Sequence, residues 1–204
     1  MATVESKTVY FENPGVQNTD EVFRIAKQRA KELGIKTILV ASTTGVTAVK
    51  AMDALKGFRI IIVTHSAGFL EPNTQEFTEE NRKIVESKGG IMVTAAHAFG
   101  GINRAMRQGD IPEAKTTYIV GDVIATTLRI LGQGVKVACE IAAMAADAGL
   151  VRTDEEVISI AGTGAGNGGR GADTALVVQP APSHLVFTMA VKEIVCKPRN
   201  PHRY

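Results

Sequence analysis

Residues 37–47 constrain the fold of this 204-residue chain more than any other stretch. The stretch begins with the apolar run Thr37–Ala41, passes through small hydroxyl and glycine residues, and then shows apolar residues at helical spacing from Val46. A continuous apolar strand is typical of a parallel sheet that is covered on both faces. We therefore expect a strand, a tight turn and a helix, and with them an α/β fold.

The same pattern recurs along the chain. Strand-like runs at Phe58–Val63 and Ile91–Val93 also end in small polar residues, and helical patterns separate the runs. Strands and helices that alternate form right-handed βαβ units, which place the turns after successive strands at one edge of the sheet. Further strands are expected at Val157–Ala161 and Thr174–Val178. The length predicts a single α/β domain that spans residues 1–204.

Composition narrows the class of protein. The chain is 45% hydrophobic and 22% charged, and its net charge of +2 provides no broad positive field. Nucleic acid is therefore not an expected partner. The N-terminal residues lack a basic segment followed by an apolar block, and charged residues interrupt the most apolar helical stretch, Val135–Val151. We expect a cytoplasmic protein with no membrane partner.

The turn after the first buried strand favours an anion. At the start of a helix the first backbone N–H groups have no partner within the helix, and Ser or Thr hydroxyls add further donors. A phosphate or carboxylate would suit such a turn. The alternative is that Thr43 or Thr44 simply caps the helix. The candidate ligand contacts are Ser42, Thr43, Thr44, Gly45 and Thr47.

Two histidines occupy equivalent positions after the later strands. Either His65 or His97 could act as an acid or base near neutral pH, or could simply hydrogen-bond its own loop. Ser66 lies next to His65, but the G-x-S-x-G turn is absent and no third orienting residue is identifiable, so a hydrolase is not predicted. The spacing of His and acidic residues fits no metal motif, and we assign no metal.

The segment Gly162–Gly171 is rich in glycine and contains the spacing G-x-G-x-x-G. A dinucleotide site would need a helix at this point, whereas the segment leads into the strand at Thr174–Val178. We interpret it as an exposed hairpin loop whose N–H groups line an anion site, with Arg170 as a charged contact. The alternative is a flexible loop without a ligand. The candidate contacts are Gly166, Asn167, Gly168, Gly169 and Arg170.

The order of these parts resembles the C-terminal α/β domain of pyruvate kinase. The similarity rests on the strand that ends in Ser-Thr-Thr-Gly-Val-Thr ahead of a helix, and on the glycine-rich loop that precedes a strand ending in Val-Val-x-Pro. It covers roughly residues 18–182 and is closest to small archaeal and bacterial stand-alone proteins of this kind. The resemblance implies a three-layer α/β fold with a mostly parallel sheet and an antiparallel C-terminal strand.

In pyruvate kinases the two loops hold the phosphates of a sugar-bisphosphate effector, so the resemblance implies that residues 42–47 and 166–170 contact a phosphate. The chain departs from that pattern because its glycine-rich loop has no tryptophan. It is also too short for the catalytic (β/α)₈ barrel, which takes about 250 residues, so we do not expect a pyruvate kinase. The stand-alone proteins look like binders of flavin mononucleotide (FMN). This implies further contacts at Thr64, His65, Ser66, Gly68, Phe69, His97 and Phe99.

The expected function is therefore to bind a phosphorylated small molecule, FMN, at the carboxyl edge of the sheet, as a non-catalytic sensor or carrier. One alternative is a flavin-dependent oxidoreductase that uses the same pocket, with His65 and His97 as the catalytic candidates. Another is an interaction module with a vestigial pocket. The alanine-rich helix at Val135–Ala148 could pack against a second subunit in a homo-oligomer, or could be buried within one domain.

Overall fold

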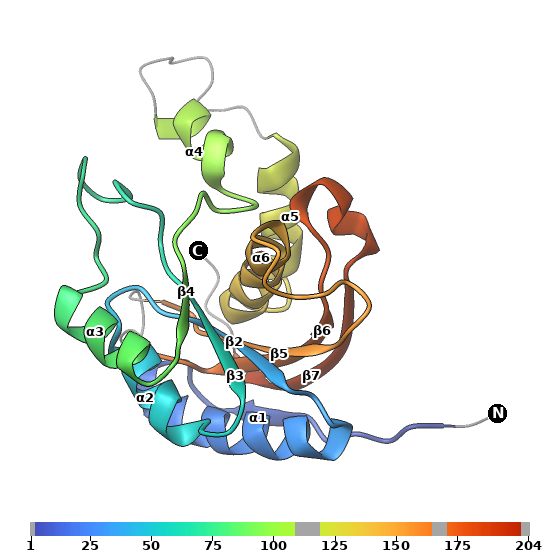
Figure 1. Ribbon diagram of the computed structural model, residues 1–204. Coiled ribbons are helices and arrows are strands. Elements are labelled where there is room, and N and C mark those ends of the chain that lie inside the picture. The colour runs from blue at the N-terminus through green and yellow to red at the C-terminus, as the bar shows by residue number, and fades with distance from the viewer. Residues whose placement is uncertain (1–2, 109–118, 165–170, 201–204) are drawn as a thin grey trace.

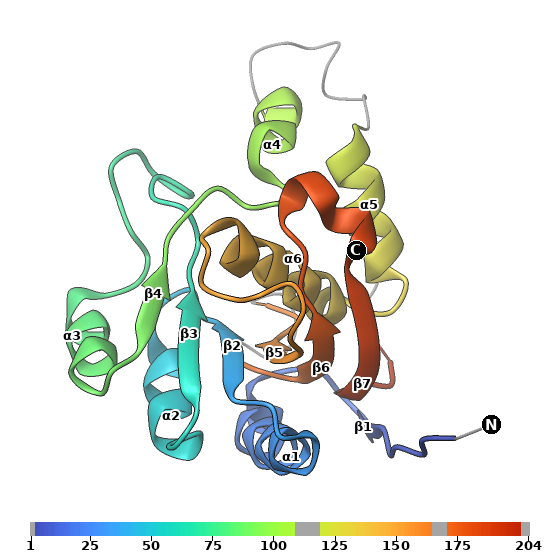
Figure 2. The ribbon, with the colours of Figure 1, turned by 45° about the vertical axis from the view of Figure 1, so that its right-hand side comes forward.

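A mixed sheet forms the centre of the computed structural model, which describes residues 3–108, 119–164 and 171–200 (Figure 1). Within these residues the sheet has seven strands in the order β1-β7-β6-β5-β2-β3-β4, with β1 and β4 at its edges (Figure 2). The strands are β1 (Val9–Phe11), β2 (Thr37–Ala41), β3 (Arg59–Val63), β4 (Ile91–Val93), β5 (Val157–Ala161), β6 (Thr174–Gln179) and β7 (Ala190–Pro198).

One strand runs against the others. β2 pairs in parallel with β3 and β5, and β4 extends the parallel arrangement beyond β3. β6 is antiparallel to both of its neighbours, β5 and β7, whereas β1 is parallel to β7. The predicted α/β fold is therefore confirmed, including a mostly parallel sheet with a reversed strand near the C-terminus.

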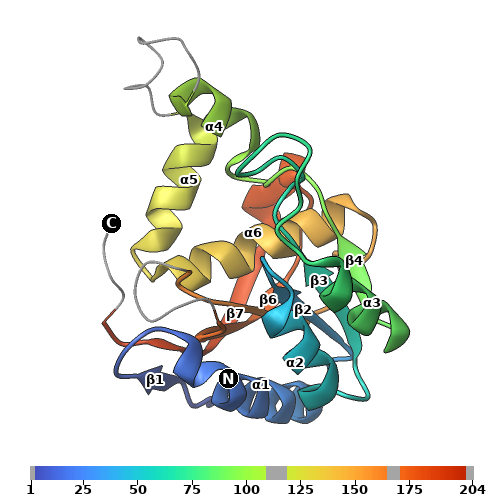
Figure 3. The ribbon, with the colours of Figure 1, turned by 90° about the vertical axis from the view of Figure 1, so that its left-hand side faces the viewer.

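Helices cover both faces of the sheet and complete three layers. Figure 3 shows α1 and α2 on the side of the sheet opposite to α5 and α6. The helices are α1 (Thr19–Leu33), α2 (Val46–Ala54), α3 (Glu79–Ser87), α4 (Gly101–Gln108), α5 (Val120–Arg129) and α6 (Gln133–Asp147), with short 3-10 turns η1 (Val16–Asn18) and η3 (Ser183–Thr188).

The apolar strands bury alternate residues in two separate cores. In β2, Ile38 and Val40 pack with residues of α1 and α2, whereas Leu39 packs on the other face with residues of α6. In β3, Ile60 and Ile62 belong to the first core and Ile61 to the second. Burial on both faces explains why these strands are apolar throughout rather than alternating.

Helix α6 lies across the second face of the sheet. Its small residues permit a close approach, and the Ser159 hydroxyl of β5 donates a hydrogen bond of 2.8 Å to the Ala138 carbonyl. Ala138, Ala142 and Ala145 are fully buried within this one chain. In the part of the chain that the structure describes, no helix has the length and apolar content that crossing a membrane would require.

Candidate functional site

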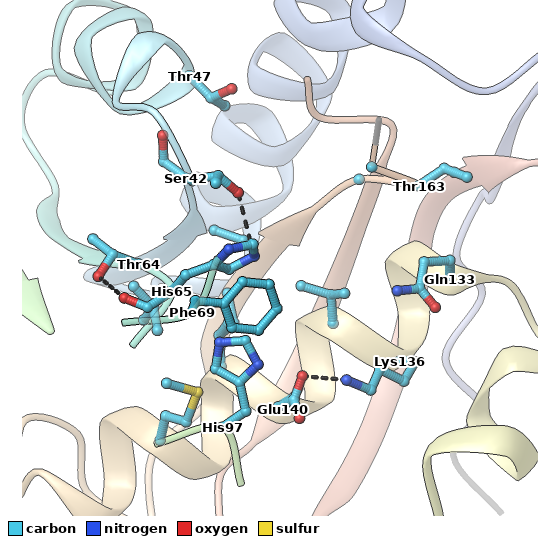
Figure 4. Close-up of a pocket in the computed structure, with 18 of the residues that line it drawn as sticks. Ser42, Thr47, Thr64, His65, Phe69, His97, Gln133, Lys136, Glu140 and Thr163 are labelled. Carbon is cyan, nitrogen blue, oxygen red and sulfur yellow. Dashed lines mark hydrogen bonds and ion pairs between the residues drawn. The ribbon is translucent and has the colours of Figure 1, made fainter. Parts of the chain in front are cut away.

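A cavity of about 220 Å³ opens where β2, β3 and β4 end (Figure 4). We call it the polar pocket. The turns after the three strands meet here, as the βαβ pattern predicts. Seven residues expected from the sequence line it: Ser42, Thr43, Thr47, Thr64, His65, Phe69 and His97. The helices α4, α5 and α6 add the polar side chains of Arg104, Arg129, Gln133, Lys136 and Glu140.

The turn between β2 and α2 is capped differently from the prediction. The Ser42 hydroxyl accepts a hydrogen bond of 3.2 Å from the backbone N–H of Ala48, in the first turn of α2. The expected cap by Thr43 or Thr44 is therefore wrong. The N-cap residue is Gly45, whose φ of 99° turns the chain so that Ser42 reaches back to the helix. Thr43 consequently remains as part of the pocket wall.

Contacts from α3 and from the residues just before it fix the conformation of this turn. The Thr44 carbonyl accepts a hydrogen bond of 2.9 Å from the Asn81 side-chain amide. A Cβ atom at Gly45 would lie 2.5 Å from Asn81 Cβ and 2.9 Å from Phe77 Cε1, so only glycine fits there. Thr44 and Gly45 are not among the residues that line the pocket. Their role in this structure is to shape the turn.

His65 is held at both nitrogens of its ring. Nδ1 lies 2.6 Å from Glu76 Oε2, and Nε2 lies 3.4 Å from Thr43 Oγ1. Its backbone carbonyl accepts hydrogen bonds from the Thr64 hydroxyl at 2.8 Å and from the Gln75 side chain at 3.0 Å. Glu76 is the orienting group that the sequence did not identify. It lies in an irregular loop, and its one sequence signal is that it is acidic.

An aromatic cluster forms one wall of the pocket. The Phe69 ring packs against both histidines, with its centroid 4.1 Å from that of His65 and 5.0 Å from that of His97. The two histidine rings are themselves 5.2 Å apart. The guanidinium carbon of Arg104 lies 4.0 Å from the centroid of Phe69, which is a cation–π contact. The structure thus brings together the two catalytic candidates, and adds a cation that the sequence analysis missed.

Helix α6 contributes a buried ion pair to the opposite wall. Lys136 pairs with Glu140 one turn later, and their side chains are only 8% and 6% exposed. The second oxygen of Glu140 accepts a hydrogen bond of 2.9 Å from the backbone N–H of Phe99. Burial lowers the pKa of Lys136, while the negative charge of Glu140 opposes that shift. The i, i+4 spacing of these charges within an apolar helix was a signal that could have revealed the pair.

His97 is neutral at physiological pH. Burial lowers the pKa of its imidazole to about 4, although the carboxylate of Glu140 partly opposes the shift. Nearby positive charge on Lys136 and Arg104 lowers the pKa further. His97 therefore offers the pocket one neutral donor and one acceptor rather than a positive charge.

The charge around the pocket is predominantly positive. Among the described residues, Arg104, Arg129 and Lys136 line it, against one lining carboxylate, that of Glu140. The Arg129 guanidinium donates a hydrogen bond of 2.7 Å to the Gln133 side chain, which fixes its position. Together with the start of α2, these cations create a field that suits an anionic ligand.

Several predicted contacts lie elsewhere. Phe99 is 3% exposed and packs in the core, where it borders a different cavity. Ser66 and Gly68 are not among the lining residues. Gly166, Asn167, Gly168, Gly169 and Arg170 fall outside the described residues. The ends of that loop, however, line the polar pocket through Gly162, Thr163, Gly164 and Gly171.

A second cavity, of about 600 Å³, lies between α5, α6, η3 and β7. We call it the apolar cavity. Its walls consist of Phe99, Ile119, Val120, Val123, Ile124, Thr127, Leu128, Cys139, Val186, Phe187, Met189 and Val191. Burial raises the pKa of the Cys139 thiol to about 12, so this cysteine is not poised to react as a thiolate.

Metal ligation has little support in the described residues. Among them, no three His, Cys, Asp or Glu side chains are grouped as a metal ion would require. The cysteine of β7, Cys196, is buried, and burial raises the pKa of its thiol to about 12. The chemistry available at the polar pocket is therefore that of hydroxyls, cations, imidazoles and one carboxylate.

Comparison with known proteins identifies one family. The model of the pyruvate kinase alpha/beta domain matches residues 20–178, a range that includes β2 to β5, all but the last residue of β6, and every described residue that lines the polar pocket. A crystal structure of a mutant O-ureido-L-serine synthase with bound O-ureido-L-serine is 14% identical, with a TM-score of 0.30. The alignment covers 88% of this chain and 62% of that enzyme chain. A similarity this low supports no conclusion about fold or function.

Proposed function

We propose a function from the premise that the chain belongs to the pyruvate kinase alpha/beta domain family: its polar pocket binds the phosphate of a small ligand, FMN. One observation carries this proposal. The hydroxyl-rich start of α2 and the guanidinium groups of Arg104 and Arg129 line the same cavity. Hydroxyls, helix N–H groups and arginines are the donors that proteins use to hold phosphate.

The phosphate would be held by the turn after β2. Ser42 accepts the Ala48 N–H and keeps its own O–H as a donor, and Thr43 and Thr47 provide further hydroxyls in the pocket wall. The first N–H groups of α2 and the positive end of its dipole favour a negative charge at the same place. Arg129, fixed by Gln133, supplies a charged contact from the opposite side.

The flavin ring system would need flat and apolar surroundings. Phe69 offers an aromatic surface, and Val137, Ile141 and Met144 of α6 form an apolar wall in the same pocket. Arg104 already lies over the Phe69 ring, so the α6 wall is the more open of the two surfaces. The enclosed volume is below the roughly 300 Å³ at which typical ligand pockets begin, so part of the ring system would extend out of the cavity.

We propose that the bound FMN is carried or sensed rather than turned over. When bound, FMN supplies hydride and one-electron chemistry, and a flavin-dependent oxidoreductase is the alternative for this same pocket. That alternative requires NADH or NADPH to reduce the bound flavin at a useful rate, followed by reoxidation by an acceptor. Alanine at His65 and His97 should change both rates if those residues are catalytic.

The proposal is tested by titrating FMN and riboflavin into flavin-free protein and following flavin fluorescence. We expect saturable binding of FMN and much weaker binding of riboflavin, which lacks the phosphate. T47V should weaken FMN binding about tenfold, the value of one hydrogen bond to a charged group. T44V is the matched control, because Thr44 is in the same turn but not in the pocket wall. No FMN uptake, together with no flavin in the purified protein, would overturn the proposal.

A further inference from the structure

The chain Thr43–His65–Glu76 sets the direction of a hydroxyl hydrogen in the polar pocket. Glu76 is 11% exposed, and its carboxylate lies 2.6 Å from His65 Nδ1. The other ring nitrogen, Nε2, lies 3.4 Å from Thr43 Oγ1, along the dashed line at His65 in Figure 4. Three residues from the β2–α2 turn and the β3–α3 loop thus form one line of hydrogen bonds that ends in the pocket wall.

An ionised carboxylate only accepts hydrogen bonds, so the hydrogen of His65 lies on Nδ1 whenever the imidazole is neutral. Nε2 is then an acceptor, and the Thr43 hydroxyl donates its single hydrogen to it. When His65 is protonated, Nε2 becomes a donor. The Thr43 oxygen then accepts from His65, and its hydrogen is free to point elsewhere.

A phosphate oxygen only accepts, so Thr43 can donate to it and keep its hydrogen bond to His65 only in the second of these two states. When His65 is neutral and Thr43 donates to it, the side of the Thr43 oxygen that faces the ligand carries only lone pairs. These lone pairs repel a phosphate oxygen. We propose that phosphate binding at the polar pocket takes up a proton on His65, and that Glu76 is the positioning residue that makes this coupling possible. The inference rests on the proposed function, and it assigns the ligand to the class of phosphate monoesters bound as dianions.

Other charged groups face His65 from the neighbouring elements. His97 lies beside it in the loop after β4, Arg104 comes from α4, and Lys136 and Glu140 come from α6. Lys136 and Glu140 pair with each other, and His97 is neutral near pH 7 because burial lowers its pKa to about 4. A bound dianion would therefore be the main new charge beside His65, and it favours the imidazolium.

Calorimetric titration with FMN in two buffers of different ionisation enthalpy counts the protons taken up on binding. At pH 8 the imidazole of free histidine is neutral and a phosphate monoester is already a dianion, so uptake reports on the protein. We expect net proton uptake of up to one proton per FMN, and a Kd that rises with pH above neutrality by at most about tenfold per pH unit.

Variants separate this coupling from a merely structural role. E76Q should cut the proton uptake to less than half and flatten the dependence of Kd on pH, whereas E80Q removes the same charge from the exposed start of α3 and should change neither. T43V should also reduce uptake, and T43S, which keeps the hydroxyl, should restore it. The variants are compared by circular dichroism to confirm that they are folded.

The outcomes distinguish this inference from the proposed function. Wild-type protein that binds FMN with no proton uptake and a flat pH profile would overturn the coupling and leave FMN binding intact. The same conclusion follows if E76Q and E80Q behave alike. Wild-type protein that binds no FMN at any pH would overturn both. Uptake of a proton that depends on Glu76 and on the Thr43 hydroxyl supports the coupling.

Discussion

The polar pocket and the apolar cavity lie on different sides of α6 and differ in kind. The polar pocket has about 220 Å³ and receives Lys136 and Glu140 from this helix, whereas the apolar cavity has about 600 Å³ and receives Cys139. The smaller cavity contains side chains whose positions are fixed by hydrogen bonds. In the larger one the walls are almost entirely apolar, and Phe187 is 84% exposed.

This difference teaches that volume alone does not identify a functional site. A ligand is oriented by a few polar groups at fixed positions, and the polar pocket has these at the β2–α2 turn, at His65 and along α6. The apolar cavity provides contact area without such groups. The following predictions test whether ligand binding and buried charge belong to the polar pocket alone.

The largest expected effect comes from E140A, which breaks the buried ion pair of the polar pocket. Lys136 would keep a buried positive charge without its partner, and the Phe99 N–H would lose its acceptor. We expect the free energy of unfolding in urea to fall by about 3–5 kcal/mol. The double variant K136M/E140L is the control and should lose less, because it leaves no unpaired charge. Equal losses in both variants would contradict this account of the pair.

The next effect is that of G45A on the turn that shapes the polar pocket. Gly45 and Gly57 have nearly the same backbone conformation, with φ of 99° and 98°, but only Gly45 has neighbours where a Cβ atom would stand. G57A should lower the free energy of unfolding by about 1–2 kcal/mol, which is the backbone strain alone. G45A should lower it by about 1–3 kcal/mol more, because the added methyl group overpacks the turn. G45A should also weaken FMN binding. Equal unfolding free energies for the two variants would show that the turn is not held by α3.

The dependence of stability on pH gives a third, smaller effect. Burial lowers the pKa of His97 from 6.5 to about 4, so between these values the unfolded chain binds a proton that the folded protein does not. The contribution of His97 to the free energy of unfolding is therefore fully present above pH 6.5 and is lost as the pH falls toward 4. This histidine should account for about 2 kcal/mol of that loss.

The matched variant for this measurement is H97F, which keeps an aromatic ring beside Phe69 but cannot be protonated. Urea unfolding of both proteins at pH 7, 5.5 and 4.5 isolates the contribution of His97 to stability. The carboxylates titrate in both proteins, so their contribution cancels in the difference. H97F should lose about 2 kcal/mol less than wild type over this range. Identical losses would mean that His97 is protonated in the folded protein as readily as in the unfolded chain.

The smallest expected effect is that of a charge placed in the apolar cavity. Val123 lines this cavity and is partly exposed, so V123K can extend its ammonium group to water. We expect the Kd for FMN to change less than about twofold, because long-range effects of exposed charges are screened by salt. A tenfold loss of FMN affinity in V123K would place flavin contacts in the apolar cavity instead.

The sequence predicted the fold because its signals are periodic. Continuous apolar runs at β2 and β3 indicated burial on both faces, and the handedness of βαβ units placed the turns after them at one edge. Four residues that follow those strands line the polar pocket: Ser42, Thr43, Thr64 and His65. These predictions needed only the direction of each strand and the position where it ended.

The parts that could not be predicted depend on side-chain direction and on irregular loops. The left-handed Gly45 moves the capping role from Thr43 or Thr44 to Ser42, which no spacing rule indicates. Glu76 lies eleven residues after His65 in a loop without periodicity, and Arg104 reaches the pocket from a separate helix. The end of a strand locates an edge of the sheet but does not fix the direction of each nearby side chain. Phe99 was therefore expected in the pocket, whereas its ring lies in the core.

The most direct test of the central claim is the ratio of the dissociation constants of riboflavin and FMN, measured on the same flavin-free preparation. The two ligands differ only in the phosphate that we place at the β2–α2 turn. We predict that riboflavin binds at least about a hundredfold more weakly than FMN, because two or more charge-assisted hydrogen bonds are lost. A ratio near one would mean that the hydroxyl turn and its facing cations do not hold a phosphate.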